Sequence, residues 1–177
     1  MNRGVSVRKC GVLSILIVSI AGFSLAADHA FIKFEGLDGG SLDSLHNRWC
    51  DLVSFDQSIY RKASATGPSR RSVGADLKDI VVIKTLDKAS PKLAEAVCNG
   101  KVFPKVEIHL TTSDKTYFAY ELQNVQVTAY SVSNSASPTD PPIEEVSLKF
   151  EKIKVVYTEF DASGRPKGTT VYEWDVR

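Results

Sequence analysis

The chain has 177 residues, of which 43% are hydrophobic and 24% are charged, and this balance is typical of one globular domain with one core. The formal charge of +1 is unevenly distributed, because three of the 22 basic residues lie in the first ten positions and the remainder has 19 basic and 21 acidic residues. The part of the chain after these ten residues is thus mildly acidic and lacks the stripe of basic residues that nucleic acid binding requires. This argues against nucleic acid as a partner.

The first 26 residues predict an export signal. They contain a basic start, an apolar run and a small-residue cleavage site, formed by Arg3, Arg8 and Lys9, by Cys10–Phe23 and by Ser24–Ala26. The alternative is an uncleaved anchor, because the uncharged stretch 10–27 reaches the lower limit of roughly 17 residues for spanning a bilayer. The shortness of the apolar run favours cleavage between Ala26 and Ala27. This predicts a secreted or periplasmic domain of residues 27–177 that is free of the membrane.

Two cysteines remain after this cleavage, Cys50 and Cys98. Disulfides persist in the compartments that exported proteins reach, so a bridge between the two is one interpretation. The other interpretation is a pair of free thiols that pack as small hydrophobic side chains, since a domain of this size needs no covalent staple.

From residue 28 onward, apolar and polar residues mostly alternate, which predicts half-buried β-strands. The predicted strands are His29–Phe34, Trp49–Tyr60, Leu77–Leu86, Phe103–Thr112, Tyr117–Val132, Ile143–Phe160 and Thr169–Asp175. The segments Arg61–Asp76 and Ser133–Pro142 are rich in small residues or proline and are predicted as exposed loops. The first loop is long for a compact domain, and we expect it to make contacts with a partner.

One segment, Ser90–Cys98, has the features of a short helix. Ser90 suits the N-cap, Pro91 suits the first helical position, and Asn99–Gly100 supplies a stop. Farther along the chain, a turn at Ser113–Lys115 joins two alternating runs and predicts a hairpin. The two strands of that hairpin should be antiparallel neighbours.

The two longest predicted strands each change phase midway. In the first strand the apolar positions are even up to Leu122 and odd from Val125, and in the second they are even up to Phe150 and odd from Ile153. Because one extra residue moves all later side chains to the other face, each change predicts a bulge. The bulges are expected near Gln123–Asn124 and Glu151–Lys152.

Bulges bend strands, and bent long strands let a sheet curl into a barrel or pass between two packed sheets. The predicted fold class is therefore mainly β. We expect a curled antiparallel β-barrel or sandwich with one short lateral α-helix, formed by residues 27–177 as a single domain.

No catalytic, metal-binding or cofactor-binding motif is recognisable. The histidines His29, His46 and His109 are separated by 17 and 63 residues, which is not a metal-ligand spacing. His109 is on the polar side of its strand and is predicted to face solvent, as paired acids such as Glu144–Glu145 usually do. His46 follows a glycine-rich stretch, residues 37–43, that is predicted as a structured turn, and its role is open. The sequence therefore predicts a protein that is not an enzyme.

Four sets of residues follow one another in a specific order. They are Phe31–His46 with Trp49, then Asp87–Lys101, then Leu122–Tyr130 with Glu145–Ile153, and finally Tyr172–Val176. Their features are a strand followed by a Gly, Gly, Ser, Asp, His succession, a helix entry, two long strands and a closing strand. In this order, over nearly all of residues 30–177, they resemble the haemolysin-coregulated protein (Hcp) family of type VI secretion systems.

The resemblance implies a curled β-barrel with a lateral helix, assembled as hexameric rings that stack into the inner tube of a contractile injection machine. It also implies release into the medium, other type VI components as partners, and small effector proteins as cargo in the ring lumen. Loops between strands help rings to meet in this family, which nominates Arg61–Asp76 for stacking. Exposed strand edges suit such self-association, because a closed ring satisfies them.

The export signal leaves two functions to distinguish. Tube subunits of this family assemble in the cytoplasm, so cleaved export would remove the protein from the site of tube assembly. The first interpretation is a structural, ring-forming component of the type VI apparatus, either an inner-tube subunit or a secreted component. The alternative is an exported binding or adaptor module that keeps the fold and acts in the periplasm or outside the cell.

Overall fold

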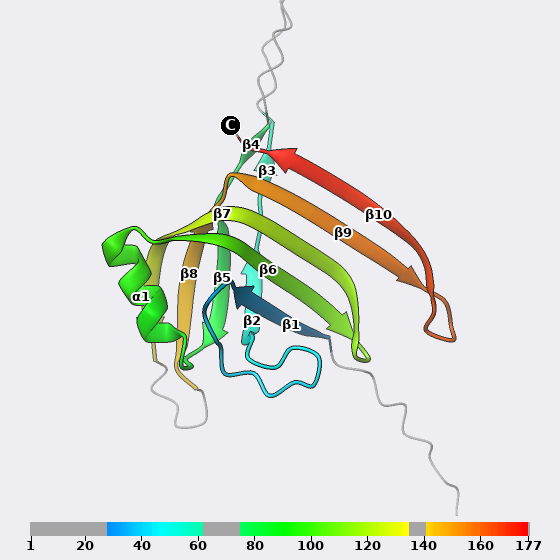
Figure 1. The fold of residues 1–177 in the computed structure, drawn as a ribbon, viewed down its shortest axis with the longest axis horizontal. Helices are drawn as coiled ribbons and strands as arrows, with labels where there is room; N and C mark the ends of the chain where they lie inside the picture. Colours follow the sequence, from blue (N-terminus) through cyan, green and yellow to red (C-terminus); the bar gives the residue numbers. More distant parts are fainter. Residues whose placement is uncertain (1–27, 62–74, 135–140, 177) are drawn as a thin grey trace, which may run out of the picture.

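The computed structural model describes residues 28–61, 75–134 and 141–176 (Figure 1). The strands in these ranges are β1 (His29–Phe34), β2 (Cys50–Asp56), β3 (Ile59–Tyr60), β4 (Asp76–Leu77), β5 (Ile80–Thr85), β6 (Val102–Thr112), β7 (Lys115–Ser133), β8 (Ile143–Lys149), β9 (Lys152–Phe160) and β10 (Pro166–Asp175). Helix α1 (Ser90–Asn99) lies between β5 and β6 in the chain. The predicted export signal with its cleavage site, and most of the predicted loop Arg61–Asp76, lie outside the described residues.

The large sheet is antiparallel and closes on itself. Its strand order is β10-β9-β7-β6-β1-β2-β5-β8, and β8 also pairs with β7. This last pairing makes a barrel of β7, β6, β1, β2, β5 and β8, while β9 and β10 continue the sheet outside it. Strands β3 and β4 form a separate two-stranded ribbon. The predicted curled barrel with a lateral helix is confirmed.

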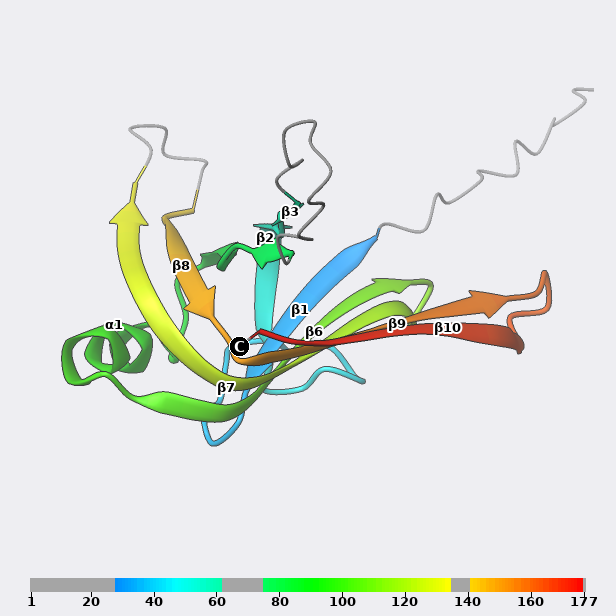
Figure 2. The ribbon, with the colours of Figure 1, turned by 90° about the horizontal axis from the view of Figure 1, so that it is seen from above.

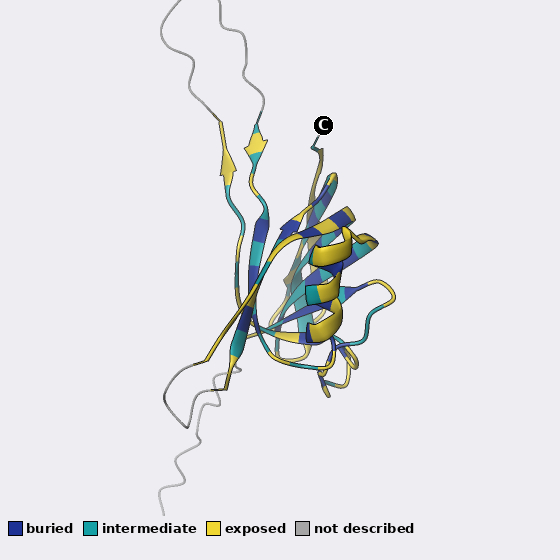
Figure 3. Ribbon diagram, turned by 90° about the vertical axis from the view of Figure 1, so that its left-hand side faces the viewer, coloured by how far each residue is buried: buried dark blue, intermediate teal, exposed yellow. Residues whose placement is uncertain are grey.

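The core of the barrel comes from alternate residues of its strands and from the inner side of α1. Its fully buried apolar side chains include Ile32, Ile80, Val82, Leu93, Phe103, Val106, Ile108, Leu122, Val125, Val146, Leu148 and Ile153. Each large apolar side chain buried in this way stabilises the fold by about 1.5–3 kcal/mol relative to an exposed one. Figure 3 shows α1 on the outside of the barrel, with its outer side exposed.

The helix ends where the sequence predicts, because Gly100 has a φ of 66° and its N–H donates a hydrogen bond to the Ala96 carbonyl. The prediction of Ser90 as N-cap is wrong by one position, since Ala89 occupies the cap without a side-chain bond. Asp87 takes over the capping task, because its carboxylate accepts a hydrogen bond from the Ala89 N–H at 2.9 Å. Ser90 Oγ instead accepts one from the Asp87 N–H, also at 2.9 Å.

The predicted hairpin is confirmed as β6 and β7. Thr112 pairs with Lys115, so the turn itself is only Ser113–Asp114, and both residues have left-handed φ values of 48° and 61°. A two-residue turn with two positive φ angles matches the twist of the flanking strands. The register that the turn sets holds for Thr111 and Thr112 and shifts by one residue at Leu110, from which it continues unbroken to Val102.

Both predicted changes of face are confirmed. On β7, Leu122 and Val125 are both fully buried, and Asn124 between them has a left-handed φ of 53°. The prediction of a bulge at Gln123–Asn124 is wrong for the β6–β7 pairing, whose register is unbroken there, and the register shift in the β7–β8 pairing lies between Val127 and Ala129. The expected single strand 143–160 is divided at residues 150–151 into β8 and β9, and both pair with β7. At this division Asn124 Nδ2 of β7 donates a hydrogen bond to Glu151 Oε2 at 2.7 Å.

Candidate assembly surface

The sheet continues beyond the barrel as a wing, which consists of Phe118–Gln123 of β7 with strands β9 and β10. Figure 2 shows β9 and β10 running together away from the side of the barrel that carries α1. Strand β10 ends the sheet order, so its only strand neighbour among the described residues is β9, and all its residues are exposed. A long edge strand of this kind has backbone donors and acceptors available for pairing with another chain.

The strand register places the side chains of the wing in rows. On one face the rows are Leu122, Ile153 and Trp174, then Tyr120, Val155 and Tyr172, then Phe118 and Tyr157. Exposure rises along each row away from the barrel: Leu122 and Ile153 are 0% exposed, whereas Trp174 is 41% exposed. The apolar surface of the core thus continues onto an uncovered surface, which we call the aromatic wing face and define as Tyr157, Tyr172 and Trp174.

The opposite face of the wing is charged near the barrel and apolar farther out. Its rows are Gln123, Lys152 and Asp175, then Glu121, Lys154 and Glu173, then Ala119, Val156 and Val171. Lys152 Nζ lies 2.7 Å from Glu173 Oε1, so opposite charges pair across neighbouring strands. Burial in an interface would therefore favour the aromatic wing face and would cost desolvation energy on the charged face.

The segment between β1 and β2, residues 35–49, folds back over the outer face of the sheet as the β1–β2 loop. Its backbone is held by hydrogen bonds from the Gly39 N–H to the Arg48 carbonyl at 2.7 Å and from the Ser41 N–H to the Trp49 carbonyl at 2.8 Å. A Cβ at Gly39 would lie 2.3 Å from the Trp49 oxygen, so this approach requires glycine. Residues 37–43 are therefore ordered as predicted, but the turns themselves lie on either side of them, at residues 35–36 and 47–48.

Two histidines that are far apart in the sequence meet under this loop. His46 is 3% exposed, with its Nδ1 3.0 Å from Asp43 Oδ1 and its Nε2 2.9 Å from His109 Nδ1. The prediction that His109 faces solvent is wrong: the loop covers the outer face of β6 at this position. Burial, together with the neighbouring His46, lowers the pKa of His109 to about 4. The third histidine, His29, is exposed at the start of β1.

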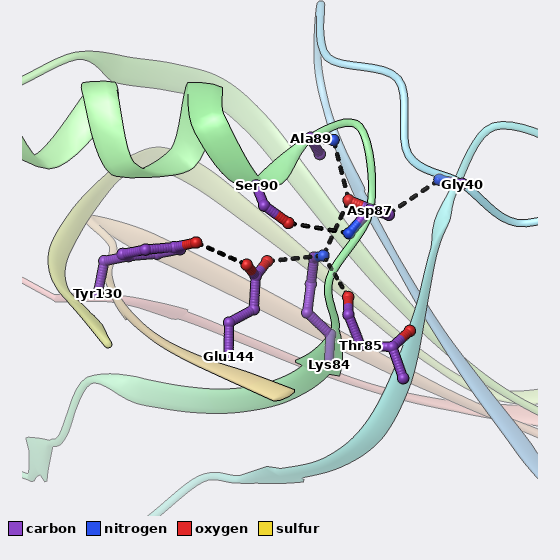
Figure 4. A network of polar contacts seen from close by, with 8 residues as sticks. All are labelled: Gly40, Lys84, Thr85, Asp87, Ala89, Ser90, Tyr130 and Glu144. Atoms are coloured by element: carbon purple, nitrogen blue, oxygen red, sulfur yellow. Dashed lines mark hydrogen bonds and ion pairs between the residues drawn. The ribbon is translucent and has the colours of Figure 1, made fainter. Parts of the chain in front are cut away.

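A buried polar network connects the barrel, the helix and the β1–β2 loop (Figure 4). Lys84 Nζ of β5 lies 2.6 Å from Glu144 Oε1 of β8 and 2.9 Å from Asp87 Oδ1. Tyr130 of β7 donates a hydrogen bond to Glu144 Oε2 at 2.7 Å, and Asp87 accepts one from the Gly40 N–H at 2.9 Å. These contacts fix where the loop, the helix start and three strands of the barrel meet.

The side chains of Lys84 and Glu144 are both 0% exposed, which corrects the expectation that Glu144 faces water. Desolvation opposes the charged form of Lys84, yet the hydrogen bonds from Nζ to Glu144 and Asp87 outweigh it and raise the pKa of this lysine. Desolvation is likewise outweighed at Asp87, whose pKa is lowered by Lys84 and the Gly40 N–H. Burial, followed by the bond to Glu144, raises the pKa of Tyr130 to about 12. The network therefore favours the charged forms of Lys84 and Asp87.

The structure does not join the two cysteines. Cys50 is buried and Cys98 is exposed, and both are free thiols. Burial raises the pKa of the Cys50 thiol well above its ordinary value, which keeps it protonated. Within the described ranges, no cluster of three or more His, Cys, Asp or Glu side chains is arranged to hold a metal ion, and no helix is long and apolar enough to cross a membrane.

Comparison with known proteins identifies the family. Residues 31–157 match the model of the family described as "Type VI secretion system effector, Hcp". The chain belongs to the Hcp family. Protein hcp1 of Pseudomonas aeruginosa is 26% identical over 153 residues, which are 83% of this chain and 94% of that protein. The chain is thus a type VI secretion protein of the Hcp type.

Solved structures agree with the Hcp assignment. One described as a type six secretion system protein has a TM-score of 0.79 at 26% identity and covers 85% of this chain and 96% of its own. Hcp1 from Salmonella typhimurium has the same fold, with a TM-score of 0.71 at 24% identity over 85% of this chain and 95% of its own. The resemblance stated from the sequence is confirmed.

Proposed function

We propose that this Hcp domain assembles into a closed homo-oligomeric ring, a hexamer as in the family it resembles, and serves as a tube subunit or secreted component of a type VI secretion system. The aromatic wing face carries this proposal. It continues the apolar surface of the core outside the barrel, and it ends at the unpaired edge of β10. A second copy that covers this face would bury three aromatic side chains and pair the edge at once.

A ring requires the wing of one copy to meet a different surface of the next copy, because a contact between two identical surfaces ends in a two-fold dimer. The described residues offer such a surface on β2 and β3, where Val53, Ile59 and Tyr60 are 60%, 48% and 56% exposed. Strand β2 is paired with β1 and β5, so it offers exposed side chains rather than a free barrel edge, and it differs in this from β10. This asymmetry supports a head-to-tail contact.

Family membership supports two further parts of the proposal. Other type VI components would contact the assembled ring, and small effector proteins would occupy its lumen as cargo. Ring stacking would use Arg61–Asp76, so deletion of residues 62–75 is expected to weaken stacking and to leave the fold intact. Loss of cooperative unfolding in that deletion would instead assign the segment to the core.

The proposed homo-oligomeric ring can be tested by two variants that each introduce one negative charge, on opposite faces of β10. Trp174→Glu puts a carboxylate on the aromatic wing face, whereas Thr169→Glu puts one on the opposite face of β10. Light scattering of the purified protein at high concentration should give a ring-sized mass for the parent and for Thr169→Glu, and a monomer mass for Trp174→Glu. A monomeric parent protein would refute the ring.

The sequence of residues 1–26 favours a second candidate, an exported module that keeps the fold and acts in the periplasm or outside the cell. It predicts cleavage between Ala26 and Ala27 when the gene is expressed without any secretion machine. The intact mass of the exported protein decides this, because it fixes the N-terminus and the thiol state together. Retention of residues 1–26 and export that depends on the machine would favour the tube component.

A further inference from the structure

Asp43, His46 and His109 form a chain of hydrogen bonds at the β1–β2 loop, and this chain can hold only a limited number of protons. Both ring nitrogens of His46 are engaged, Nδ1 with Asp43 Oδ1 and Nε2 with His109 Nδ1. Two imidazole nitrogens 2.9 Å apart share a single hydrogen, which one ring donates and the other accepts. Because the Asp43 carboxylate can only accept, His46 Nδ1 carries a hydrogen and His46 Nε2 accepts the one from His109 Nδ1. A further proton on His109 finds no acceptor in this contact and places a charge in a partly desolvated site.

We propose that Asp43, His46 and His109 form a proton-sensitive latch that holds the β1–β2 loop closed over the sheet at neutral pH and releases it in acid. Asp43 Oδ1 also accepts hydrogen bonds from the backbone N–H groups of Leu45 and His46, at 2.9 Å and 2.8 Å. The aspartate therefore fixes the backbone and the ring of the loop, and His109 fixes the ring to β6. The latch does not depend on ring assembly.

The latch lies on aromatic side chains. The ring of His46 stacks on Phe31 of β1 with centroids 4.3 Å apart, and its edge meets Trp49 at 4.9 Å. Trp49 also lies 4.5 Å from the His109 ring. Phe31 is 4% exposed although it points away from the barrel core, so the closed loop supplies its cover. Opening the loop would expose this phenylalanine.

Other charged groups share this face and bear on the proton affinity of the pair. Glu107 of β6 favours the charged form of His109, whereas Lys105 disfavours it. By register, the remaining titratable side chains on the neighbouring strands of this face are His29, Lys33, Asp51 and Glu121. Desolvation is the largest influence on His109 and disfavours its charge. The closed loop thus resists protonation, which is the linkage that a latch requires.

The size of the effect follows from this linkage. In the closed state His109 has a pKa of about 4, against an ordinary value of 6.5 that the exposed ring of the open loop would recover. Because the folded value is depressed, closure is favoured fully above the ordinary value and is weakened as the pH falls toward the closed-state value. The open-to-closed ratio should rise by up to about 300-fold over this window.

The release changes the surface that the molecule presents. Leu42 and Leu45 of the loop are 90% and 62% exposed, and internal hydrogen bonds hold them in fixed positions while the loop is closed. Opening would move both leucines and would uncover Phe31, on which the His46 ring of the loop is stacked. At acid pH, the apolar surface formed by Leu42 and Leu45 would thereby be replaced by one that includes Phe31.

Trp49 is a built-in probe of the latch, because protonated histidine quenches indole fluorescence on contact. The chain has two tryptophans, so Trp174→Phe leaves Trp49 as the only one. In this background, fluorescence measured from about pH 7.5 to about pH 4 should show a transition within the window between the two pKa values. His109→Gln should abolish the transition, since glutamine keeps a donor for His46 Nε2 and takes up no proton. His29→Gln is the matched control and should leave the transition unchanged.

Three results would overturn the latch. They are the same pH profile with and without His109, a flat profile in the Trp174→Phe background, and loss of the far-UV signal of the barrel at the same midpoint. A second measurement needs no variant: hydrogen exchange at the Leu45 and His46 amides of the unmodified protein, corrected for the intrinsic rate, should accelerate up to about 300-fold as the pH falls. Constant protection of these two amides would contradict the proposal.

Discussion

Removal of the buried cation of the polar network should destabilise the fold strongly. Lys84→Met keeps a side chain of similar length and leaves the Glu144 carboxylate, which is 0% exposed, without its ion-pair partner at 2.6 Å. Breaking a buried pair from one side costs about 3–5 kcal/mol, because the remaining charge is desolvated and uncompensated. Adding Glu144→Leu removes that charge as well, so the double variant should recover at least half of the loss.

The assay is urea unfolding followed by far-UV circular dichroism, with every variant at one protein concentration because association would add to stability. Lys92→Met is the matched control, since it breaks the Lys92–Glu95 pair, which has a similar distance of 2.7 Å but exposed side chains. The control should leave the unfolding midpoint almost unchanged. If Lys84→Met behaved like the control, or the double variant were less stable than the single one, the reasoning would be wrong.

Three further outcomes follow from the described residues. A maleimide should label Cys98 in the native protein and reach Cys50 only after denaturation, and equal labelling of both would contradict the assigned burial. Gly39→Ala should cost about 1–3 kcal/mol through backbone overlap, whereas Gly168→Ala, which has open space around it, should be tolerated in the same unfolding assay. The pKa of Asp87 is depressed, so its contribution to stability is present above its ordinary value of 3.8 and is lost as the pH falls below it; urea midpoints should therefore decline in that range.

Much of the fold could be predicted because the barrel strands bury one face each. The alternation of side chains located the strands, and the switch from Leu122 to Val125 showed where β7 bends. The same alternation contained a signal for the polar network. Lys84 follows Ile80 and Val82 on the inward positions of β5, so its burial was readable in principle from the pattern.

The paired histidines and the wing could not be predicted in this way. His109 has the spacing of an outward residue, and only the fold shows that a loop 63 positions earlier in the chain returns to cover it. Strand β10 alternates like a strand with one buried face, yet all its residues are exposed, because none of the described elements other than β9 packs extensively against it. Local sequence specifies which side chains share a face, and the topology decides whether anything covers that face.

The central claim is that another copy covers the aromatic wing face and the edge of β10. Hydrogen exchange along Pro166–Asp175, measured at low and at high protein concentration, tests it most directly. The account predicts that the edge amides of β10 exchange rapidly in dilute solution and become protected as the concentration rises, and that Trp174→Glu removes this dependence. Exchange along β10 that is the same at every concentration would contradict the claim.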